Sequence, residues 1–310
     1  MKPLRIGTRG SKLALWQAGH IRERLERECG WASEMVIIKT SGDKFESAAV
    51  AAIGGKGIFI KEIEDALLDR RIDLAVHSMK DVPTETPRGL LFPAITERED
   101  PRDCLISRRG ETLQKLPQGA CIGTSSLRRQ SQLRYFRPDL RVADLRGNVD
   151  TRLRKVEEGG VDAIVVAKAG LDRLGFSGKI TEVISAEIMV PAVGQGALAI
   201  EMRDDASGLM ETLAGFDHPP TRAAVTAERA LLAELEGGCQ VPLGAWARME
   251  NGTLRMDARV LAADGSECIE RCASGSADDA EKIGRRLAQE LLDAGADRLL
   301  RLAGRSVRGN

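Results

Sequence analysis

Apolar runs and amphipathic stretches alternate along the first two thirds of the chain. The run Leu4 to Thr8 predicts a strand, and Ala14, Ala18, Ile21 and Leu25 follow it at the spacing of one buried helix face. Regular alternation of strands and helices is typical of an α/β fold that is built around a parallel sheet.

The order of these elements occurs twice. The segment 120–124 (ACIGT) repeats the pattern of 5–8 (RIGT), and 162–166 (DAIVV) repeats the pattern of 73–77 (DLAVH). Each copy has the order strand, helix, strand, helix, strand. This order predicts two doubly wound α/β lobes whose strand ends face a shared cleft.

The chain is expected to cross between the lobes at two places. The charged segment 97–103 (EREDPRD) contains a proline, as a hinge does. A second crossing falls near 190–197, and residues 198–201 are expected to return as a strand to the first lobe. The first lobe is therefore predicted to consist of two separate parts of the sequence.

The pattern changes near residue 221. A helix is predicted over 223–235, strands alternate around the hairpin turns at 251–252 (NG) and 264–265 (DG), and a final helix covers about 277–294. These elements indicate a small α+β C-terminal domain. The expected boundaries are residues 1–98 and 198–216 for domain 1, 103–192 for domain 2, and 220–310 for domain 3.

The composition excludes several classes of function. The 310 residues carry 46 Lys and Arg against 46 Asp and Glu, with 3% aromatics, so a basic field or stacking platform for nucleic acid is not expected. The sequence has no run of about 18 apolar residues that would span a membrane. The first residues lack a signal-peptide core, so we expect a cytoplasmic protein.

Neither the cysteines nor the histidines are spaced as metal ligands. Six cysteines occur without a CxxC pair, and three histidines occur without HxxxH or HExxH spacing. We therefore expect reduced thiols, no disulfide framework and no metal.

The stretch 73–83 (DLAVHSMKDVP) carries the first candidate chemistry. A buried strand over 74–76 is followed at once by Ser78, Lys80 and Asp81, and open α/β sheets bind ligands beyond the carboxyl ends of their strands. A carboxylate there can stabilise a developing cation or pass a proton. The alternative is an ordinary ion pair between Lys80 and Asp81 in solvent.

Cationic side chains gather at matched turns of both copies. Arginine forks bind carboxylates in a bidentate way, and helix N-termini present N–H groups to anions. The expected ligand is a small molecule with several carboxylates or phosphates. The alternative is that these cations only keep the surface soluble. They are Arg9, Lys80, Arg128, Arg129, Arg146, Arg152 and Arg173.

Two further residues are candidates for the site. Lys56 lies in the small-residue stretch 41–57, which predicts a loop and lacks the GxxxxGK[ST] order of a nucleotide P-loop. It is either a cation on a lid or a solvated lysine. Cys239 lies in a Gly-Gly-Cys turn, where a bulky group can attach; the alternative is a buried small hydrophobe.

Five motifs stand in collinear order along the chain. They are HSMKDVP (77–83), GTSSLRRQ (123–130), LRGNVDTRL (145–153), VGQGALAIE (193–201) and EGGCQVP (236–242). Together they resemble the porphobilinogen deaminase (hydroxymethylbilane synthase) family over essentially the whole chain. The resemblance implies two lobes that are like periplasmic binding proteins, and a small third domain.

The resemblance also implies an activity. A transferase of this family condenses four porphobilinogen molecules head to tail on a covalent dipyrromethane cofactor and releases ammonia at each step. It then frees hydroxymethylbilane by hydrolysis for the biosynthesis of haem and other tetrapyrroles.

Roles for individual residues follow from the same resemblance. Cys239 would hold the cofactor through a thioether, and Lys56 would lie on a loop that covers the cleft. Asp81 would contact pyrrole N–H groups, assist the loss of ammonia and stabilise an azafulvenium-like cation. The groups that would bind cofactor or substrate are Arg9, Ser11, Ser78, Lys80, Thr124, Ser125, Ser126, Arg128, Arg129, Arg146, Arg152, Arg173 and Gln195.

Two other functions fit parts of the sequence. A non-enzymatic two-lobed anion-binding module explains the repeat and the arginines, but it explains neither Asp81 nor the third domain. A phosphotransfer enzyme is disfavoured because the sequence lacks a P-loop and an acidic metal cluster. No apolar stripe demands a protein partner, so we expect a monomer whose partner is porphobilinogen.

Overall fold

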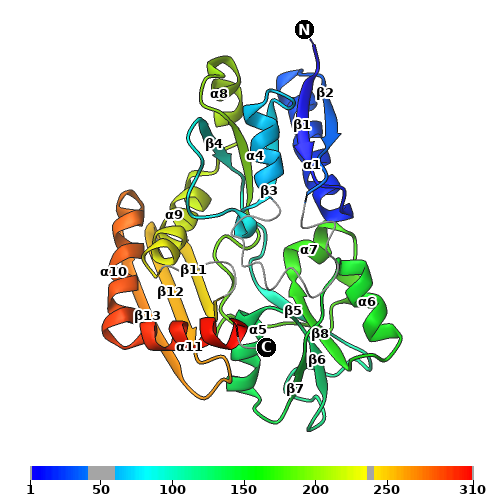
Figure 1. Ribbon diagram of the computed structural model, residues 1–310, viewed down its shortest axis with the longest axis vertical. Coiled ribbons are helices and arrows are strands. Elements are labelled where there is room, and N and C mark those ends of the chain that lie inside the picture. The colour runs from blue at the N-terminus through cyan, green and yellow to red at the C-terminus, as the bar shows by residue number, and fades with distance from the viewer. Residues whose placement is uncertain (1, 41–59, 236–240, 309–310) are drawn as a thin grey trace. The chain divides into compact units, whose positions relative to one another are not determined.

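In the computed structural model, which describes residues 2–40, 60–235 and 241–308, the chain divides into two units (Figure 1). Unit 1 comprises Met1–Glu99 and Ala197–Arg222, and unit 2 comprises Asp100–Gly196 and Ala223–Asn310. Two of the predicted site residues, Lys56 and Cys239, lie outside the described residues.

Unit 1 contains a five-stranded sheet with the strand order β2-β1-β3-β10-β4. The strands β1 (Leu4–Thr8), β2 (Ser33–Ile37) and β3 (Leu74–Ser78) are parallel. Strand β10 (Leu198–Arg203) runs antiparallel between β3 and β4 (Leu90–Ile95). The predicted return of the chain near residue 198 to the first sheet is therefore confirmed.

Helices cover both faces of this sheet. Helices α1 (Lys12–Cys29) and α8 (Ser207–Ala214) share an apolar core with one face, and α4 (Lys61–Leu68) packs on the other face. Because side chains alternate along a strand, Ser78 of β3 faces α1 whereas His77 faces the side of α4.

Unit 2 contains a second five-stranded sheet of the same topology, in the order β7-β6-β8-β5-β9. The strands β6 (Cys121–Gly123), β7 (Arg141–Ala143) and β8 (Ala163–Ala167) are parallel. Strand β5 (Asp103–Ser107) runs antiparallel between β8 and β9 (Glu182–Val183). The repeat in the sequence thus corresponds to two sheets of equal strand order.

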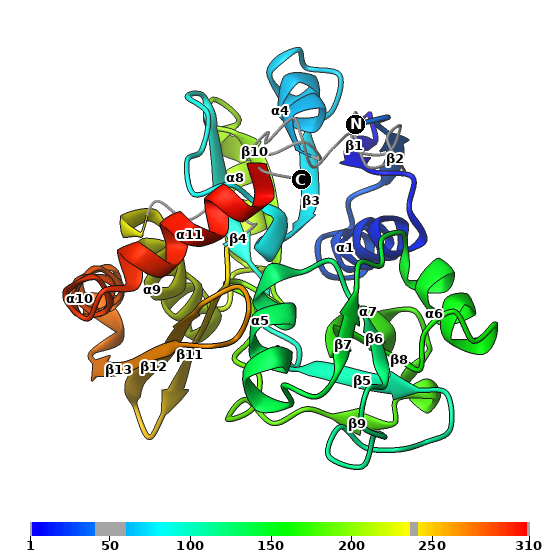
Figure 2. The same ribbon diagram turned by 60° about the horizontal axis from the view of Figure 1, so that its bottom comes forward.

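The second sheet is also covered on both faces (Figure 2). Helix α5 (Leu127–Phe136) shares a core with one face, and α6 (Val149–Glu157) and α7 (Lys168–Arg173) share a core with the other. The α/β fold class with two doubly wound lobes is therefore confirmed.

A glycine lies near the end of the first strand of each repeat for the same steric reason. A Cβ atom at Gly123 would lie 2.6 Å from Leu145 Cδ2 and 3.3 Å from Ile164 Cγ2, and one at Gly7 would collide with the side chain of Ile72. The repeated Ile-Gly-Thr pattern therefore marks close packing beneath the strand ends.

Unit 2 also contains a three-stranded antiparallel sheet of β11 (Leu243–Glu250), β12 (Thr253–Leu261) and β13 (Cys268–Gly275). Asn251 and Gly252 both have positive φ, at 50° and 79°, as a two-residue hairpin turn requires. The helices that pack into the core of this sheet are α9 (Pro219–Glu234), α10 (Ala280–Asp293) and α11 (Ala296–Arg308). The small α+β domain is confirmed, with one helix more than the sequence predicted.

Candidate functional site

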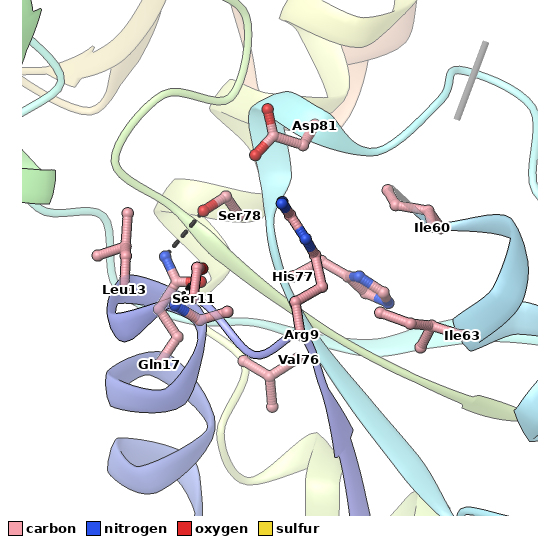
Figure 3. A pocket seen from close by; sticks show the side chains of 11 residues that line it. Arg9, Ser11, Leu13, Gln17, Ile60, Ile63, Val76, His77, Ser78 and Asp81 are labelled. Carbon is pink, nitrogen blue, oxygen red and sulfur yellow. Dashed lines mark hydrogen bonds between the residues drawn. The ribbon is translucent and has the colours of Figure 1, made fainter. Parts of the chain in front are cut away.

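A pocket in unit 1 lies where β1 and β3 end (Figure 3). It encloses about 460 Å³ of space, part of which is open to solvent. Its walls come from the turn after β1, from α1, from β3 and from the residues around the start of α4. The polar residues that line it are Arg9, Ser11, Gln17, His77, Ser78 and Asp81.

Local packing fixes the backbone turn that carries the carboxylate of this pocket. Strand β3 passes directly into the short 3₁₀ helix η1 (Met79–Asp81). The neighbours Met79 and Val82 are buried, and Met79 N–H donates to Ala197 O at 3.0 Å. Asp81 itself is exposed, and Figure 3 shows the guanidinium end of Arg9 pointing toward it.

The two serines of the pocket have defined hydrogen-bond partners. Gln17 Nε2 donates to Ser78 Oγ at 2.8 Å, which ties α1 to the end of β3. Ser11 caps α1 by accepting from Ala14 N–H at 3.3 Å. Both contacts hold polar groups at the pocket wall.

A buried ionisable pair lies on the α4 side of this sheet. His77 Nε2 lies 2.9 Å from Glu201 Oε2, and the side chains are 4% and 0% exposed. Burial, and next the negative charge of Glu201, raise the pKa of Glu64 on α4 to about 7. Three titratable groups, Glu64, His77 and Glu201, therefore interact on this side of the sheet, and His77 also lines the pocket.

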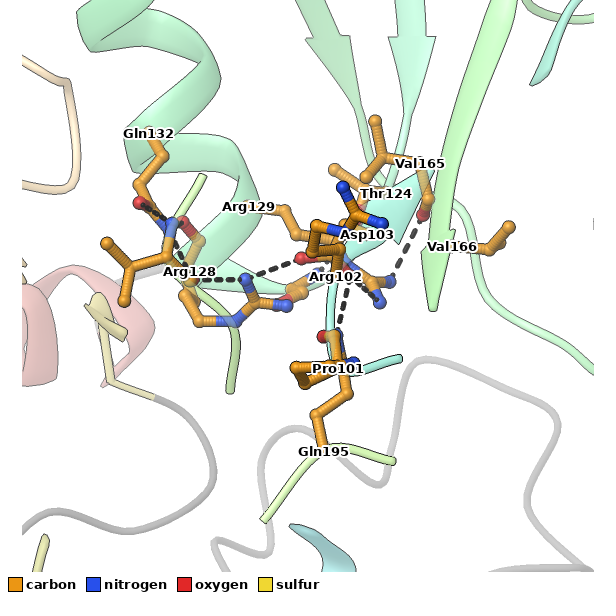
Figure 4. Close-up of polar contacts among 12 residues, drawn as sticks. Pro101, Arg102, Asp103, Thr124, Arg128, Arg129, Gln132, Val165, Val166 and Gln195 are labelled. Carbon is orange, nitrogen blue, oxygen red and sulfur yellow. Dashed lines mark hydrogen bonds and ion pairs between the residues drawn. The ribbon is translucent and has the colours of Figure 1, made fainter. Parts of the chain in front are cut away.

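In unit 2, two of the predicted arginines converge on one carboxylate (Figure 4). Arg128 Nη1 lies 2.7 Å from Asp103 Oδ2, and Arg129 Nη2 lies 2.7 Å from Asp103 Oδ1. Asp103 is fully buried. Burial opposes its ionisation, but the charges of Arg128 and Arg129 outweigh burial and hold the pKa of that carboxyl well below its usual range.

The segment that leads out of unit 2 joins the same cluster. Gln195 Nε2 donates to Asp103 Oδ1 at 3.0 Å and to Pro101 O at 2.6 Å. Arg173 Nη2 donates to Gly196 O at 2.7 Å. These contacts fix the backbone around Gln195 against the start of β5.

Two further arginines lie around α6. Arg152 Nε donates to Gly147 O at 2.8 Å, and burial, together with the nearby charge of Arg129, lowers the pKa of Arg152 to about 10. Arg146 is exposed, with Nε 3.3 Å from Asp144 Oδ2.

The polar residues before α5 organise its first turn. Ser125 Oγ donates to Leu145 O at 2.9 Å, and Ser126 N–H donates to the hydroxyl of buried Thr124 at 3.3 Å. The predicted site residues thus fall into a group in unit 1 (Arg9, Ser11, Ser78, Lys80 and Asp81) and a group in unit 2 (Thr124, Ser125, Ser126, Arg128, Arg129, Arg146, Arg152, Arg173 and Gln195).

Sequence reasoning missed two residues of these groups. Gln17 interrupts the apolar stripe of α1, and a polar residue on a buried helix face was a usable signal for it. Asp103 stands at the end of a charged segment that looked like a hinge, so nothing in the pattern distinguished it from a solvated acid.

Within the described ranges, no group of three His, Cys, Asp or Glu side chains is arranged to hold a metal ion. The helices described here include none that is long and apolar enough to cross a membrane.

Known proteins resemble this chain over most of its length. The family description "Porphobilinogen deaminase, dipyromethane cofactor binding domain" matches residues 4–211, and "Porphobilinogen deaminase, C-terminal domain" matches residues 222–293. The porphobilinogen deaminase of Syntrophobacter fumaroxidans is 50% identical over 298 residues, which cover 96% of each chain. That of Geobacter metallireducens is 52% identical over 300 residues, or 96% of this chain and 94% of the relative.

Some solved structures match part of the chain at low sequence identity. An ancestral cationic amino acid solute binding protein matches with a TM-score of 0.43 and 15% identity, over 69% of this chain and 87% of its own.

Proposed function

This chain belongs to the porphobilinogen deaminase family, and from that premise we propose how its residues divide the reaction. The family makes it a transferase of tetrapyrrole biosynthesis that acts on porphobilinogen and carries a dipyrromethane cofactor. The named relatives match nearly the whole chain, so a non-enzymatic anion-binding module is not favoured.

The arginines of unit 2 fit a cofactor that carries carboxylates. Arg128 is 4% exposed, and no described residue accepts a hydrogen bond from its Nε or Nη2. Neither atom is among the described buried atoms that lack a partner, so a ligand can reach this edge, and a carboxylate is the acceptor that fits its fork. When bound, the cofactor supplies the terminal pyrrole to which each porphobilinogen unit is joined.

We propose that the reacting centre lies in the pocket that is lined by Arg9, Ser78 and Asp81. Loss of ammonia from porphobilinogen leaves positive charge on the substrate, and a carboxylate that is already in place stabilises that charge. We assign this role to Asp81. Arg9 would bind a substrate carboxylate, and the Ser11 and Ser78 hydroxyls would contact neighbouring polar groups.

Three lysine and cysteine assignments rest on the family resemblance. Cys239 would attach the cofactor, Lys56 would contribute a cation from a covering loop, and Lys80 would bind a carboxylate beside Asp81. We further propose three domains with the boundaries given above, and a cytoplasmic monomer. The free thiols among the described cysteines support a reducing compartment.

Intact-protein mass spectrometry combined with a turnover assay tests the proposed function. The wild type should weigh more than its sequence by the mass of the attached pyrroles, and it should consume porphobilinogen with release of ammonia. Cys239→Ser should lack the adduct and the activity, because no thiolate remains to form the thioether.

The matched control is Cys272→Ser, which removes an exposed thiol of the C-terminal sheet and should keep both the adduct and the activity. The same adduct on Cys239→Ser would contradict the assignment of the attachment site. A wild type with neither adduct nor turnover would contradict the function itself.

A further inference from the structure

The buried carboxylate of Asp103 is saturated with donors. Oδ1 accepts from Arg129 Nε at 3.1 Å, Arg129 Nη2 at 2.7 Å and Gln195 Nε2 at 3.0 Å, and Oδ2 accepts from Arg128 Nη1 at 2.7 Å. Asp103 is also the first residue of β5, where its backbone O accepts from Ile184 N–H at 2.9 Å. Hydrogen bonds therefore fix both the side chain and the backbone of Asp103.

The two arginines meet this carboxylate in different ways. Arg129 presents its Nε–Nη2 edge, the fork with which guanidinium groups bind carboxylates, and its Nη1 donates to Val165 O at 3.1 Å. Arg128 uses only Nη1, which also donates to Val190 O at 2.8 Å. Figure 4 shows both side chains reaching Asp103 from the start of α5.

This difference leaves one fork available. Among the described residues, none accepts from the Nε–Nη2 edge of Arg128, although the side chain is 5% exposed. Two buried guanidinium groups and one carboxylate also leave one net positive charge. The available fork of Arg128 and the remaining positive charge thus match a single additional carboxylate in geometry and in charge.

We propose that Asp103 is a positioning residue for carboxylate recognition: it occupies the fork of Arg129, anchors Arg128 by one nitrogen, and so presents the fork of Arg128 to a carboxylate of the substrate or the growing chain. This inference rests on the proposed function for the identity of the ligand. The geometry and the charge balance rest only on the contacts of Asp103.

Electrostatics support an ionised Asp103. Burial opposes ionisation, but the charges of the two arginines outweigh burial and keep the pKa of this carboxyl well below its usual range. Burial, only partly offset by Asp103, lowers the pKa of Arg128. A desolvated cation of this kind gains more from an incoming carboxylate than a solvated one does.

The competing explanation is an ion pair that only stabilises unit 2. Both explanations predict weaker substrate binding when Asp103 is changed, but they differ for a small anion. If Asp103 positions Arg128 without being needed for the fold, its removal leaves unit 2 folded with two uncompensated guanidinium groups, so a small dicarboxylate is attracted more strongly. A purely structural ion pair would weaken both kinds of binding when it is lost.

The experiment uses Asp103→Asn in the cofactor-bearing protein, with succinate as the small dicarboxylate. The KM for porphobilinogen should rise about ten- to a hundredfold, the range for loss of a charged hydrogen bond. The inhibition constant of succinate should fall about threefold, because Arg128 and Arg129 then carry two uncompensated positive charges. Asp139→Asn removes a comparable carboxylate that pairs with Arg137 at 2.7 Å near the surface, and it should leave both constants within twofold.

Parallel weakening of porphobilinogen and succinate, or no change in either, would overturn the inference. If Asp103→Asn does not fold, the charge-balanced double variant Asp103→Asn with Arg129→Gln replaces it. The double variant should have a raised KM with a wild-type succinate constant, and a wild-type KM would overturn the inference.

A thermal-shift titration separates this inference from the proposed function. The increase in melting temperature caused by succinate should be larger in Asp103→Asn than in the wild type, whether or not the protein turns over porphobilinogen. An equal or smaller increase counts against Asp103, whereas absent cofactor and turnover in the wild type count against the function.

Discussion

Asp81 owes its position to its buried neighbours. Met79 and Val82 are 2% and 4% exposed, and they anchor the turn from which the exposed side chain of Asp81 extends. In the described part of the chain, its carboxylate accepts no hydrogen bond. A substitution there should therefore alter chemistry without altering stability.

We expect Asp81→Asn to retain the cofactor and lose turnover by about 10²–10³-fold, the typical effect of a group that stabilises transition-state charge. The free energy of unfolding should change by less than about 0.5 kcal/mol, as for other surface substitutions. Steady-state turnover and urea denaturation measure the two effects.

Glu85→Gln is the matched control, because it removes an exposed carboxylate four residues further along the same loop. It should leave turnover within twofold. Near-normal turnover of Asp81→Asn would remove this carboxylate from the mechanism.

At the level of single residues, sequence patterns indicated charged groups that follow strands, but they did not indicate the buried carboxylates that pair with other residues. Asp81 and Arg9 stand out because charged groups follow apolar strands. Glu201 and Asp103 were missed because their roles depend on partners that come from 124 and about 25 positions away. Such partners become visible only when the strands are placed side by side.

Helix α9 is joined to the segment before β10 by a buried carboxylate. Glu228 is fully buried, and it accepts from Gly194 N–H and from Ala247 N–H of β11, both at 2.7 Å. One side chain thus joins α9, the C-terminal sheet and the backbone next to Gln195.

We expect Glu228→Gln to lower the free energy of unfolding by about 1–3 kcal/mol, since the amide can accept only one of the two hydrogen bonds and buries an unmatched donor. Chemical denaturation followed by circular dichroism measures this loss.

Glu234→Gln changes an exposed acid on the same helix and should be neutral within about 0.5 kcal/mol. Equal stability of the two variants would show that Glu228 is not a structural link.

Whether a helix or strand could be predicted from the sequence depended on its length and on its apolar pattern. Strand β1 was predicted with the observed bounds, Leu4–Thr8. Strand β5 was missed because it starts with Asp103 and offers only three apolar residues, and β9 has only two residues. Helix α11 was missed because Gly295, with φ of 94°, looked like the end of the last helix.

On the scale of the whole molecule, Glu64 of unit 1 contributes to the pH dependence of the stability of the folded protein. Its pKa rises from 4.5 to about 7 on folding, so the folded protein binds more protons than the unfolded chain between these values. Stability from this group is complete below pH 4.5 and is lost as the pH rises through about 7.

We therefore expect Glu64→Gln to flatten the decline of stability between pH 5 and pH 8. The effect should be about 1 kcal/mol, because the half-buried side chain is partly screened by water. Urea denaturation of both proteins at each pH unit measures it. Asp69→Asn removes an exposed acid just after α4 that does not act on Glu64, and it should give the wild-type curve; parallel curves for Glu64→Gln and wild type would contradict the expectation.

The position of β10 also has a consequence for synthesis on the ribosome. This strand lies between β3 and β4, yet it is translated after every strand of the second sheet. The emerging polypeptide therefore exposes the edges of β3 and β4 while about a hundred further residues are made. Chaperones that shield unpaired strand edges have their longest opportunity in this interval. A gene truncated before β10 would yield a first sheet in which no strand joins β3 to β4.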